Sequence, residues 1–147
     1  MDEYVVLAGR IAAGQLAGVF FVFAMVITLA LRGVDDHTFV VSMNRINVSL
    51  VNPVFVLIFL GAPALAVVAA VLERTPILYV AAALGVTTLL ISIAINIPLN
   101  NNLAAHLSRE NFETIGVLWN AVRSVTAIGS FVCLLLSTAA ESLLGQS

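Results

Sequence analysis

The chain has 147 residues and a formal net charge of −2, and 61% of its residues are hydrophobic while only 10% are charged. Because an ordinary soluble domain carries about 25% charged residues, this chain has too few to cover a surface that faces water. Its basic residues are all arginine and form no cluster, so nucleic acid and anionic lipid headgroups are poor candidates as specific partners. Composition therefore predicts an integral membrane protein with the lipid bilayer as its main solvent.

In chain order, four apolar segments are each long enough to cross a bilayer, which takes ~20 residues of helix. They cover about residues 5–31, 53–72, 76–97 and 117–144. The first follows Met-Asp-Glu and exceeds the apolar region of a signal peptide, so no cleavage is expected. The sequence thus predicts an all-α fold, a four-helix bundle in the membrane, with a single domain over residues 1–147.

Capping residues and prolines mark where these spans begin and end. Asn52-Pro53 and Thr75-Pro76 each place a capping residue before a proline at the first helical position, which is a helix start signal. Pro98 is predicted to end the third span. Ser108 is predicted to cap a helix that continues into the fourth span.

Four spans place both termini and the turn at 73–75 on one side of the membrane, here called the terminal face. The longer segments 32–52 and 98–117 then lie together at the other side, the connector face. The arginines at the two faces leave the orientation open. The excess of arginine over lysine, together with many alanines and valines, favours a bacterial cytoplasmic membrane.

Residues 37–52 are predicted to form a short additional helix between spans one and two, with Asn44 and Asn47 on one side of it. One interpretation is a connector at the membrane surface whose amides face water. The other turns Asn47 inward, as a hydrogen-bonding wall of a pocket.

Polar residues inside the spans follow a helical spacing. Thr88, Ser92 and Asn96 are four residues apart and therefore lie on one stripe of the third span, which should face away from lipid. Hydrogen bonding between helices is a sufficient explanation of such a stripe. Gly14 and Gly18 form a G-x-x-x-G pattern in the first span and indicate close helix packing.

Arg123 is the polar residue that most needs an explanation. It follows Trp119 by one helical turn, which puts it ~6 Å deeper in the membrane, where an unpaired guanidinium is costly. It requires an anion, a wet cavity or a path back to the surface. Arg10, near the terminal face, has more room to extend back to its own interface. The single cysteine, Cys133, is expected to be a buried and inert thiol.

His37 and His106 are the only histidines, and both are predicted at the connector face. One interpretation is two loop histidines in water, and the other is general bases, because an imidazole can accept a proton near neutral pH. No metal-binding signature and no motif for a classical cofactor occurs, so neither a metal nor a cofactor is predicted.

Four short motifs resemble those of a known family. They are M-N-R-I-N at 43–47, N-P-V-F at 52–55, N-I-P-L-N at 96–100 and W-N-A-V-R at 119–123. With these motifs, the chain resembles the anthrone oxygenase-like family of small four-span membrane proteins, long catalogued as a domain of unknown function. Length, span count and motif order agree, so the resemblance covers nearly the whole chain.

The resemblance implies that a flat, lipophilic aromatic or quinone-like molecule binds at the connector face. A few members of the family oxidise anthrones to anthraquinones with O2 and no evident cofactor, while most bacterial members have no assigned activity. The motif residues carried over by position are Asn47, Asn96, Pro98, Asn100, Trp119, Asn120 and Arg123.

In an oxygenase of this kind Arg123 would stabilise an enolate oxygen, and Asn96 or Asn100 would hydrogen-bond the oxygens that become anionic. Trp119 would form an aromatic wall, and Asn47 and Asn120 would contact the substrate. Proton abstraction would fall to His106 or to a carboxylate such as Glu113.

The alternative function is not enzymatic: a small membrane subunit or scaffold whose asparagines and arginines hold the bundle together or dock a partner. A homo-oligomer or a partner in a membrane complex is left open. A carrier is disfavoured because the chain has no inverted repeat.

Overall fold

The computed structural model describes residues 2–106 and 109–144, and every regular element within these two ranges is helical. The elements are α1 (Asp2–Val22), the π-helical turn η1 (Phe23–Ile27), α2 (Thr28–Leu31), α3 (Asp36–Leu50), α4 (Pro53–Glu73), α5 (Pro76–Ile91), the π-helical turn η2 (Ser92–Asn96), α6 (Ile97–His106), α7 (Arg109–Asn111), the π-helical turn η3 (Phe112–Gly116) and α8 (Val117–Leu144). The predicted all-α fold and the additional helix between spans one and two are confirmed.

Four helices are long and apolar enough to cross a bilayer: Glu3–Leu31, Pro53–Glu73, Pro76–Leu103 and Phe112–Ser137. Large apolar side chains point outward along all of them, as at Leu7, Leu57, Leu90 and Val125. An outer surface of this kind suits lipid rather than water. The protein is therefore an integral membrane protein built as a helical bundle.

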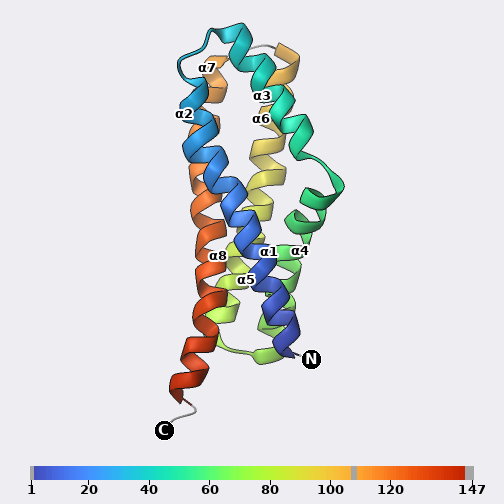
Figure 1. Cartoon of the computed structure of the whole chain (residues 1–147), viewed down its shortest axis with the longest axis vertical. Helices are drawn as coiled ribbons and strands as arrows, with labels where there is room; N and C mark the ends of the chain where they lie inside the picture. Colours follow the sequence, from blue (N-terminus) through green and yellow to red (C-terminus); the bar gives the residue numbers. More distant parts are fainter. Residues whose placement is uncertain (1, 107–108, 145–147) are drawn as a thin grey trace.

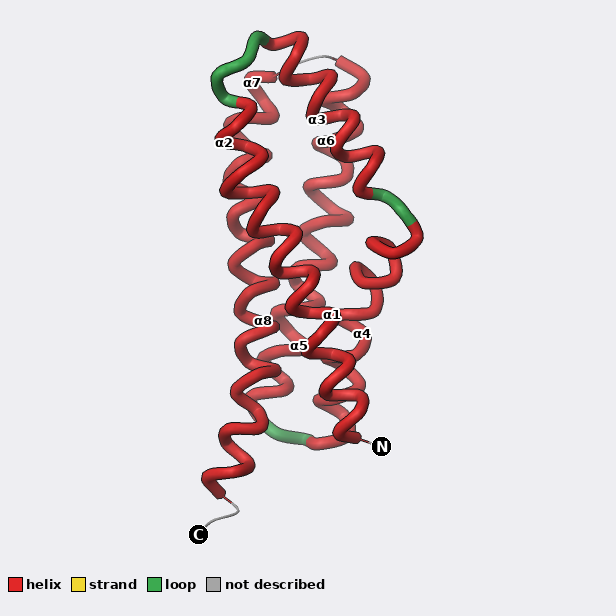
Figure 2. Tube along the Cα trace, in the orientation of Figure 1, coloured by secondary structure: helices red, strands yellow, loops and turns green. Residues whose placement is uncertain are grey.

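The bundle has three long helical columns and one divided column. Figure 1 shows α1 to α2, α5 to α6 and α7 to α8 running most of its length, while α3 and α4 follow each other along one side. The loop that joins α3 to α4 bulges outward at mid-height (Figure 2). α1 begins and α8 ends beside the turn between α4 and α5, so the predicted terminal and connector faces lie at opposite ends.

The third column does not end at Pro98, so this prediction was wrong. The helix continues through Pro98 to His106, and the turn immediately before the proline is the π-helical turn Ser92–Asn96. Proline lacks an N–H and its ring clashes with the carbonyl four residues earlier in a regular α-helix. A π-helical turn shifts the backbone pairing by one residue, and this shift lets the column pass the proline. The predicted cap Ser108 lies outside the described residues.

The helix start predicted at Asn52 is confirmed in detail. The Asn52 Oδ1 accepts a hydrogen bond of 3.0 Å from the backbone N–H of Phe55, and Pro53 is the first residue of α4. Thr75 occupies the same position before α5, but its buried hydroxyl makes no cap hydrogen bond and has no partner. The two start signals therefore look alike in sequence, but only the Asn52 side chain stabilises its helix by a cap hydrogen bond.

Replacing Asn52 with alanine is expected to destabilise α4 by about 1 kcal/mol, because a backbone donor at the helix start loses its acceptor. Thr75→Ala is the matched control and should cost little, since its hydroxyl bonds no helical N–H. Chemical unfolding of the two variants in detergent micelles measures the difference. Equal losses of unfolding free energy would contradict the assignment of the cap to Asn52.

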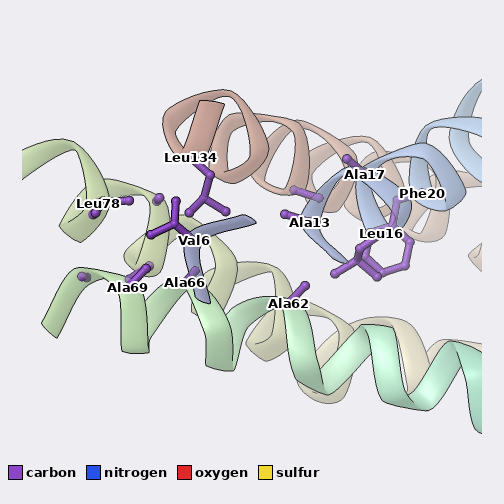
Figure 3. Close-up of a cluster of buried hydrophobic side chains, with 14 residues drawn as sticks. Val6, Ala13, Leu16, Ala17, Phe20, Ala62, Ala66, Ala69, Leu78 and Leu134 are labelled. Carbon is purple, nitrogen blue, oxygen red and sulfur yellow. The ribbon is translucent and has the colours of Figure 1, made fainter. Parts of the chain in front are cut away.

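The half of the bundle near the terminal face is held by small residues. Its core is rich in alanine, with Leu16, Phe20, Leu78 and Leu134 filling the gaps, as Figure 3 shows. Gly14 takes part in this packing, since a Cβ there would meet the Phe131 ring at 3.0 Å. A Cβ at Gly18 would meet nothing within 4 Å, so only the first glycine of the G-x-x-x-G pattern lies at a helix contact.

A second and separate apolar core fills the half near the connector face. Its buried members are Phe23, Phe39, Val40, Met43, Leu103 and Phe112. They come from η1, α3, α6 and η3, so α3 covers this core as α4 covers the first. The additional helix is thus part of the folded bundle and not a loose surface connector.

Two predictions about single residues of the terminal half need correction. Arg10 was expected to extend back to the membrane interface, but its side chain is hydrogen-bonded within the bundle. Its Nε donates to the Leu134 carbonyl at 2.7 Å and its Nη2 to the Ser137 hydroxyl at 3.1 Å. These bonds join α1 to α8. Cys133 is half-buried rather than buried and packs against the edge of the first core.

Candidate functional site

Buried polar side chains form a layer along the contact between the column of α5 and η2 and the column of α8. Thr88, Ser92 and Asn96 line one stripe of α5 and η2, and each is at most 3% exposed, so the prediction that this stripe avoids lipid is confirmed. The Thr88 and Thr126 hydroxyls are hydrogen-bonded at 2.8 Å, which ties the stripe to α8. The layer continues on α8 with Asn120, Arg123 and Ser124.

Arg123 lies in this layer, and its side chain joins the two cores. It is 7% exposed, and its Cζ lies 4.1 Å from the ring centroid of Phe20 and 5.9 Å from that of Phe23. Phe20 belongs to the first core and Phe23 to the second. The electron-rich ring faces partly compensate a buried cation.

The hydrogen bonding of Arg123 is incomplete. Its Nη2 donates to the Asn120 Oδ1 at 2.7 Å, whereas its buried Nε has no partner. The neighbouring Ser124 hydroxyl is also buried without a partner. No carboxylate within residues 2–106 and 109–144 forms an ion pair with Arg123. A cation and a hydroxyl with free hydrogen-bonding capacity thus lie side by side in sequence.

Asn96 reaches the same level of the bundle from the neighbouring column. α5 and α8 are antiparallel (Figure 1), and the contact between Thr88 and Thr126 fixes their register. Asn96 lies eight positions after Thr88. It is therefore opposite the part of α8 that lies about eight positions before Thr126. This register puts Asn96 near the level of Trp119 and Asn120. The Asn96 Nδ2 makes a weak hydrogen bond of 3.4 Å to the Ile91 carbonyl, so this buried carboxamide also has capacity for a further bond.

A groove on the outer surface lies beside this layer, and Phe23 is the residue that links the two. Its volume is about 570 Å³, and it runs along α1 and η1 beside the ends of α3 and α4. Its lining is apolar apart from Gln15 and includes Gly18, Phe23, Ile46 and Leu50. Phe23 has one side toward the groove and lies near the Arg123 guanidinium. The groove therefore ends one aromatic ring away from the buried cation.

The backbone around the layer departs from regular α-helix. The turns Phe23–Ile27 and Ser92–Asn96 are π-helical, and the Thr28 hydroxyl donates to the Phe23 carbonyl at 3.0 Å. Single π-helical turns inside α-helices are frequent at functional sites, because they rotate the following side chains and free backbone carbonyls. Phe23 and Asn96, which bound the candidate site, each belong to such a turn.

The other residues carried over from the family motifs are less closely engaged. Asn47, Asn100 and Trp119 are half-buried, on α3, α6 and α8. None of their side chains makes a hydrogen bond or ring contact with another described side chain, and Asn44 is exposed. The closest cluster among the predicted residues is therefore Asn120 with Arg123, and Asn96 stands at the same level.

Of the two proposed bases, only Glu113 has a side chain in the described part of the chain. Glu113 is committed to an ion pair with Arg109, in which its Oε1 lies 2.8 Å from Nη2. His106 ends α6, ~15 Å beyond Asn96 along the helix, and its side chain lies outside the described part of the chain. His37 is exposed in the first turn of α3 rather than in a loop. Within the described residues, no group of three or more His, Cys, Asp or Glu side chains is arranged to hold a metal ion.

Arg109 fastens the loop before α3, a role that sequence analysis missed. Its Nη1 donates to the Val34 carbonyl at 2.6 Å and its Nη2 to the Arg32 carbonyl at 2.9 Å. It also pairs with Asp36 at 3.2 Å and lies over the Phe39 ring at 4.6 Å. The hydrogen bond to Glu113, more than the one to Asp36, raises the pKa of Arg109 above its ordinary value. In the sequence, the spacing of four residues predicts the ion pair between Arg109 and Glu113 but not the bonds from Arg109 to the loop before α3.

The start of α3 is fixed by Asp35, whose carboxylate accepts hydrogen bonds from the Thr38 hydroxyl at 2.6 Å and the Thr38 backbone N–H at 3.0 Å. These bonds hold the pKa of Asp35 below its ordinary value. A lowered pKa in the folded state stabilises the fold above the unfolded pKa, and this contribution is lost as pH falls through the folded value. The cap therefore persists at neutral pH.

The chain matches no protein-family model, no curated protein and no solved structure, so its resemblance to the anthrone oxygenase-like family rests on its own motifs.

Proposed function

We propose that this membrane protein binds a flat, lipophilic aromatic molecule whose ionised oxygen pairs with Arg123, and oxidises it with O2. The observation that supports this proposal is a guanidinium that is 7% exposed, has an unpartnered Nε and pairs with no carboxylate within the described residues. A buried cation without a counter-charge is costly, and a ligand oxyanion would supply both the charge and the missing acceptor.

The surroundings of Arg123 favour an aromatic ligand. The groove beside it holds about 570 Å³ and is lined by apolar side chains, which suits a lipophilic molecule of a few fused rings. It opens on the outer surface of the bundle, so such a molecule can arrive from the lipid. Phe23 lines the groove, and its ring centroid lies 5.9 Å from the Arg123 Cζ. Its ring would turn aside to let the ligand's oxygen reach the guanidinium, and it can then stack on the ligand.

The polar groups match the charge that the proposed reaction develops. An anthrone loses the proton of its C10–H to water and becomes an enolate, whose oxygen pairs with Arg123 and the Asn120 amide. The enolate carbon then bonds to O2, and the resulting peroxide takes up a proton. Loss of the second C10–H breaks the O–O bond, which leaves a C=O group and releases one water. One anthrone and one O2 thus give one anthraquinone and one water.

In this reaction Arg123 acts by electrostatic stabilisation and not by proton transfer. A fixed cation in a site of low polarity favours the enolate over the neutral ketone, and donors such as Asn120 and Asn96 gain strength as negative charge grows on oxygen. The stabilisation of the enolate needs no rearrangement of these groups, because Arg123 is already held by Asn120 and by Phe20.

The groove provides a direct test of ligand binding. Gly18→Leu fills it without a clash, because a Cβ at Gly18 meets nothing within 4 Å. Anthrone is expected to bind the wild type and to bind Gly18→Leu at least tenfold more weakly. Gly61→Leu is the matched control: its Cβ is equally free, and Gly61 lies in a different groove, on α4.

Trp119 is the only tryptophan, so quenching of its fluorescence by anthrone in lipid nanodiscs reports binding near the candidate site. An oxygen electrode and the absorbance of anthraquinone report turnover. Binding of anthrone without O2 uptake would support the proposed ligand site and contradict the proposed oxidation. If the wild type neither binds nor oxidises anthrone, the proposal fails and the scaffold interpretation stands.

A further inference from the structure

We propose that the outer face of the α3–α4 junction binds one phospholipid molecule, with its phosphodiester group at Arg45 and an acyl chain along α4. This site is separate from the groove beside Arg123 and does not depend on the proposed function. Two further grooves carry the inference, one polar at its rim and one apolar, and they share Asn52.

The polar groove has a volume of about 550 Å³ and is lined by one face of α3. Ser42, Arg45 and Ser49 are three or four residues apart, so they line one side of the helix. Arg45 is exposed, and no side chain within residues 2–106 and 109–144 pairs with it. A free guanidinium between two hydroxyls is an arrangement that binds a phosphate oxygen well.

The apolar groove has a volume of about 760 Å³ and follows α4 from Pro53 to Ala64. Val56, Leu57 and Leu60 line it, and Gly61 leaves it unobstructed, because a Cβ there would meet nothing within 4 Å. From Pro53 to Ala64 an α-helix rises about 17 Å. One leaflet contributes about half of the ~30 Å hydrocarbon core, so the groove has the length of an acyl chain in that leaflet.

The order of the two grooves matches the orientation of a lipid. α3 lies toward the connector face and α4 continues from it toward the terminal face (Figure 1). A phospholipid in the leaflet at the connector face also places its phosphate outward and its chains toward the bilayer centre. Asn52 holds the boundary between the two grooves, since it donates to the Ser49 carbonyl at 3.2 Å and accepts from Phe55.

The site differs from the headgroup interaction that composition disfavours. A net attraction to anionic lipid requires a cluster of basic residues, which this chain lacks. Arg45 instead offers one charge to the phosphodiester that all phospholipids share, and the apolar groove adds the binding energy of the chain. We therefore expect recognition of the phosphate and the chain, with little dependence on the rest of the headgroup.

Native mass spectrometry of the full chain, released from detergent micelles with added dioleoylphosphatidylglycerol, tests the proposal. The wild type is expected to retain one lipid molecule, and Arg45→Gln and Gly61→Leu should each reduce the retained fraction at least fivefold. Gly18→Leu, which fills the other groove, should leave it unchanged. Dioleoylglycerol has the same chains without phosphate. The wild type should retain it as poorly as Arg45→Gln retains the phospholipid.

Two results would overturn the proposal. Equal retention of the phospholipid by the wild type and both variants would show only general lipid around the bundle. Equal retention of dioleoylglycerol and the phospholipid would remove the role of Arg45. Circular dichroism of each variant in the same detergent identifies unfolding, and a folded Arg45→Gln that loses the lipid supports the site.

Discussion

Arg123→Leu is expected to lower the rate of O2 uptake with anthrone at least 100-fold and to leave a folded protein in the membrane. Removal of one fixed donor to a developing oxyanion costs about 100-fold to 1,000-fold in rate. A leucine at position 123 can contact the Phe20 and Phe23 rings that flank the arginine, so the junction of the two cores stays apolar. The oxygen electrode gives the rate, and quenching of Trp119 gives ligand affinity.

The single variant leaves the buried Asn120 carbonyl oxygen without its donor, which costs about 1–3 kcal/mol. Arg123→Leu/Asn120→Leu removes both partners and should restore most of that stability, while activity stays lost. Arg123→Lys keeps the charge and loses the planar fork, so it should retain a small part of the activity.

These variants separate the two functions. If Arg123 only holds the bundle together, Arg123→Leu lowers stability and the wild type has no substrate-dependent O2 uptake to lose. If Arg123 binds a ligand, the double variant is stable, inserted and inactive. A double variant with the wild-type rate of O2 uptake would contradict the role of Arg123 as an oxyanion partner.

Much of the fold could be predicted because the bilayer imposes simple requirements. A helix must satisfy its own backbone in lipid, so length and apolar composition locate the spans. The start at Asn52 and the burial of Thr88, Ser92 and Asn96 also follow from local rules. Pro98 was mistaken for a helix end, because nothing in its local sequence indicates the π-helical turn that lets the helix continue.

The candidate site could be predicted only in part, because it depends on contacts between distant segments. Asn120 and Arg123 are three residues apart on one helix, and their spacing indicates a shared face. Phe20 completes the site from another column, and no local pattern links it to Arg123. Arg109 is a similar case, because it donates to backbone carbonyl groups more than 70 positions earlier in the chain. Every residue has a backbone carbonyl, so no residue type in the sequence indicates which ones are the acceptors.

The largest stability effect is expected at Gly85, where α4, α5 and α8 meet. A Cβ at Gly85 would lie 3.2 Å from the Ser130 Oγ and 3.4 Å from the Pro63 Cα, which is backbone and cannot turn aside. The void beside it holds only about 10 Å³, too little for a side chain. Gly85→Leu must therefore push helices apart, and we expect a loss of about 3 kcal/mol in unfolding free energy, at the upper end of the usual cost of overpacking.

Gly61→Leu is the matched control for this prediction. Both substitutions replace a helical glycine with leucine and gain the same intrinsic helix propensity, about 1 kcal/mol. Because Gly61 has open space around its Cβ position, the difference between the two variants isolates packing between helices. Unfolding by sodium dodecyl sulfate in mixed micelles measures it, and equal midpoints for the two variants would contradict the close contact at Gly85.

The physical reason for so large an effect is that lipid removes the usual driving force for helix association. Apolar side chains are as well solvated by acyl chains as by each other, so helices are held together by close contact and by hydrogen bonds between them. Ser130 forms such a bond, donating to the Ala81 carbonyl at 2.8 Å, and it can approach only because Gly85 lies one turn away without a side chain. A leucine at Gly85 removes both contributions at once. Because Thr88 on α5 is continued by Ser92 and Asn96 on η2 in the same column, loosened packing there should weaken ligand binding before the protein unfolds.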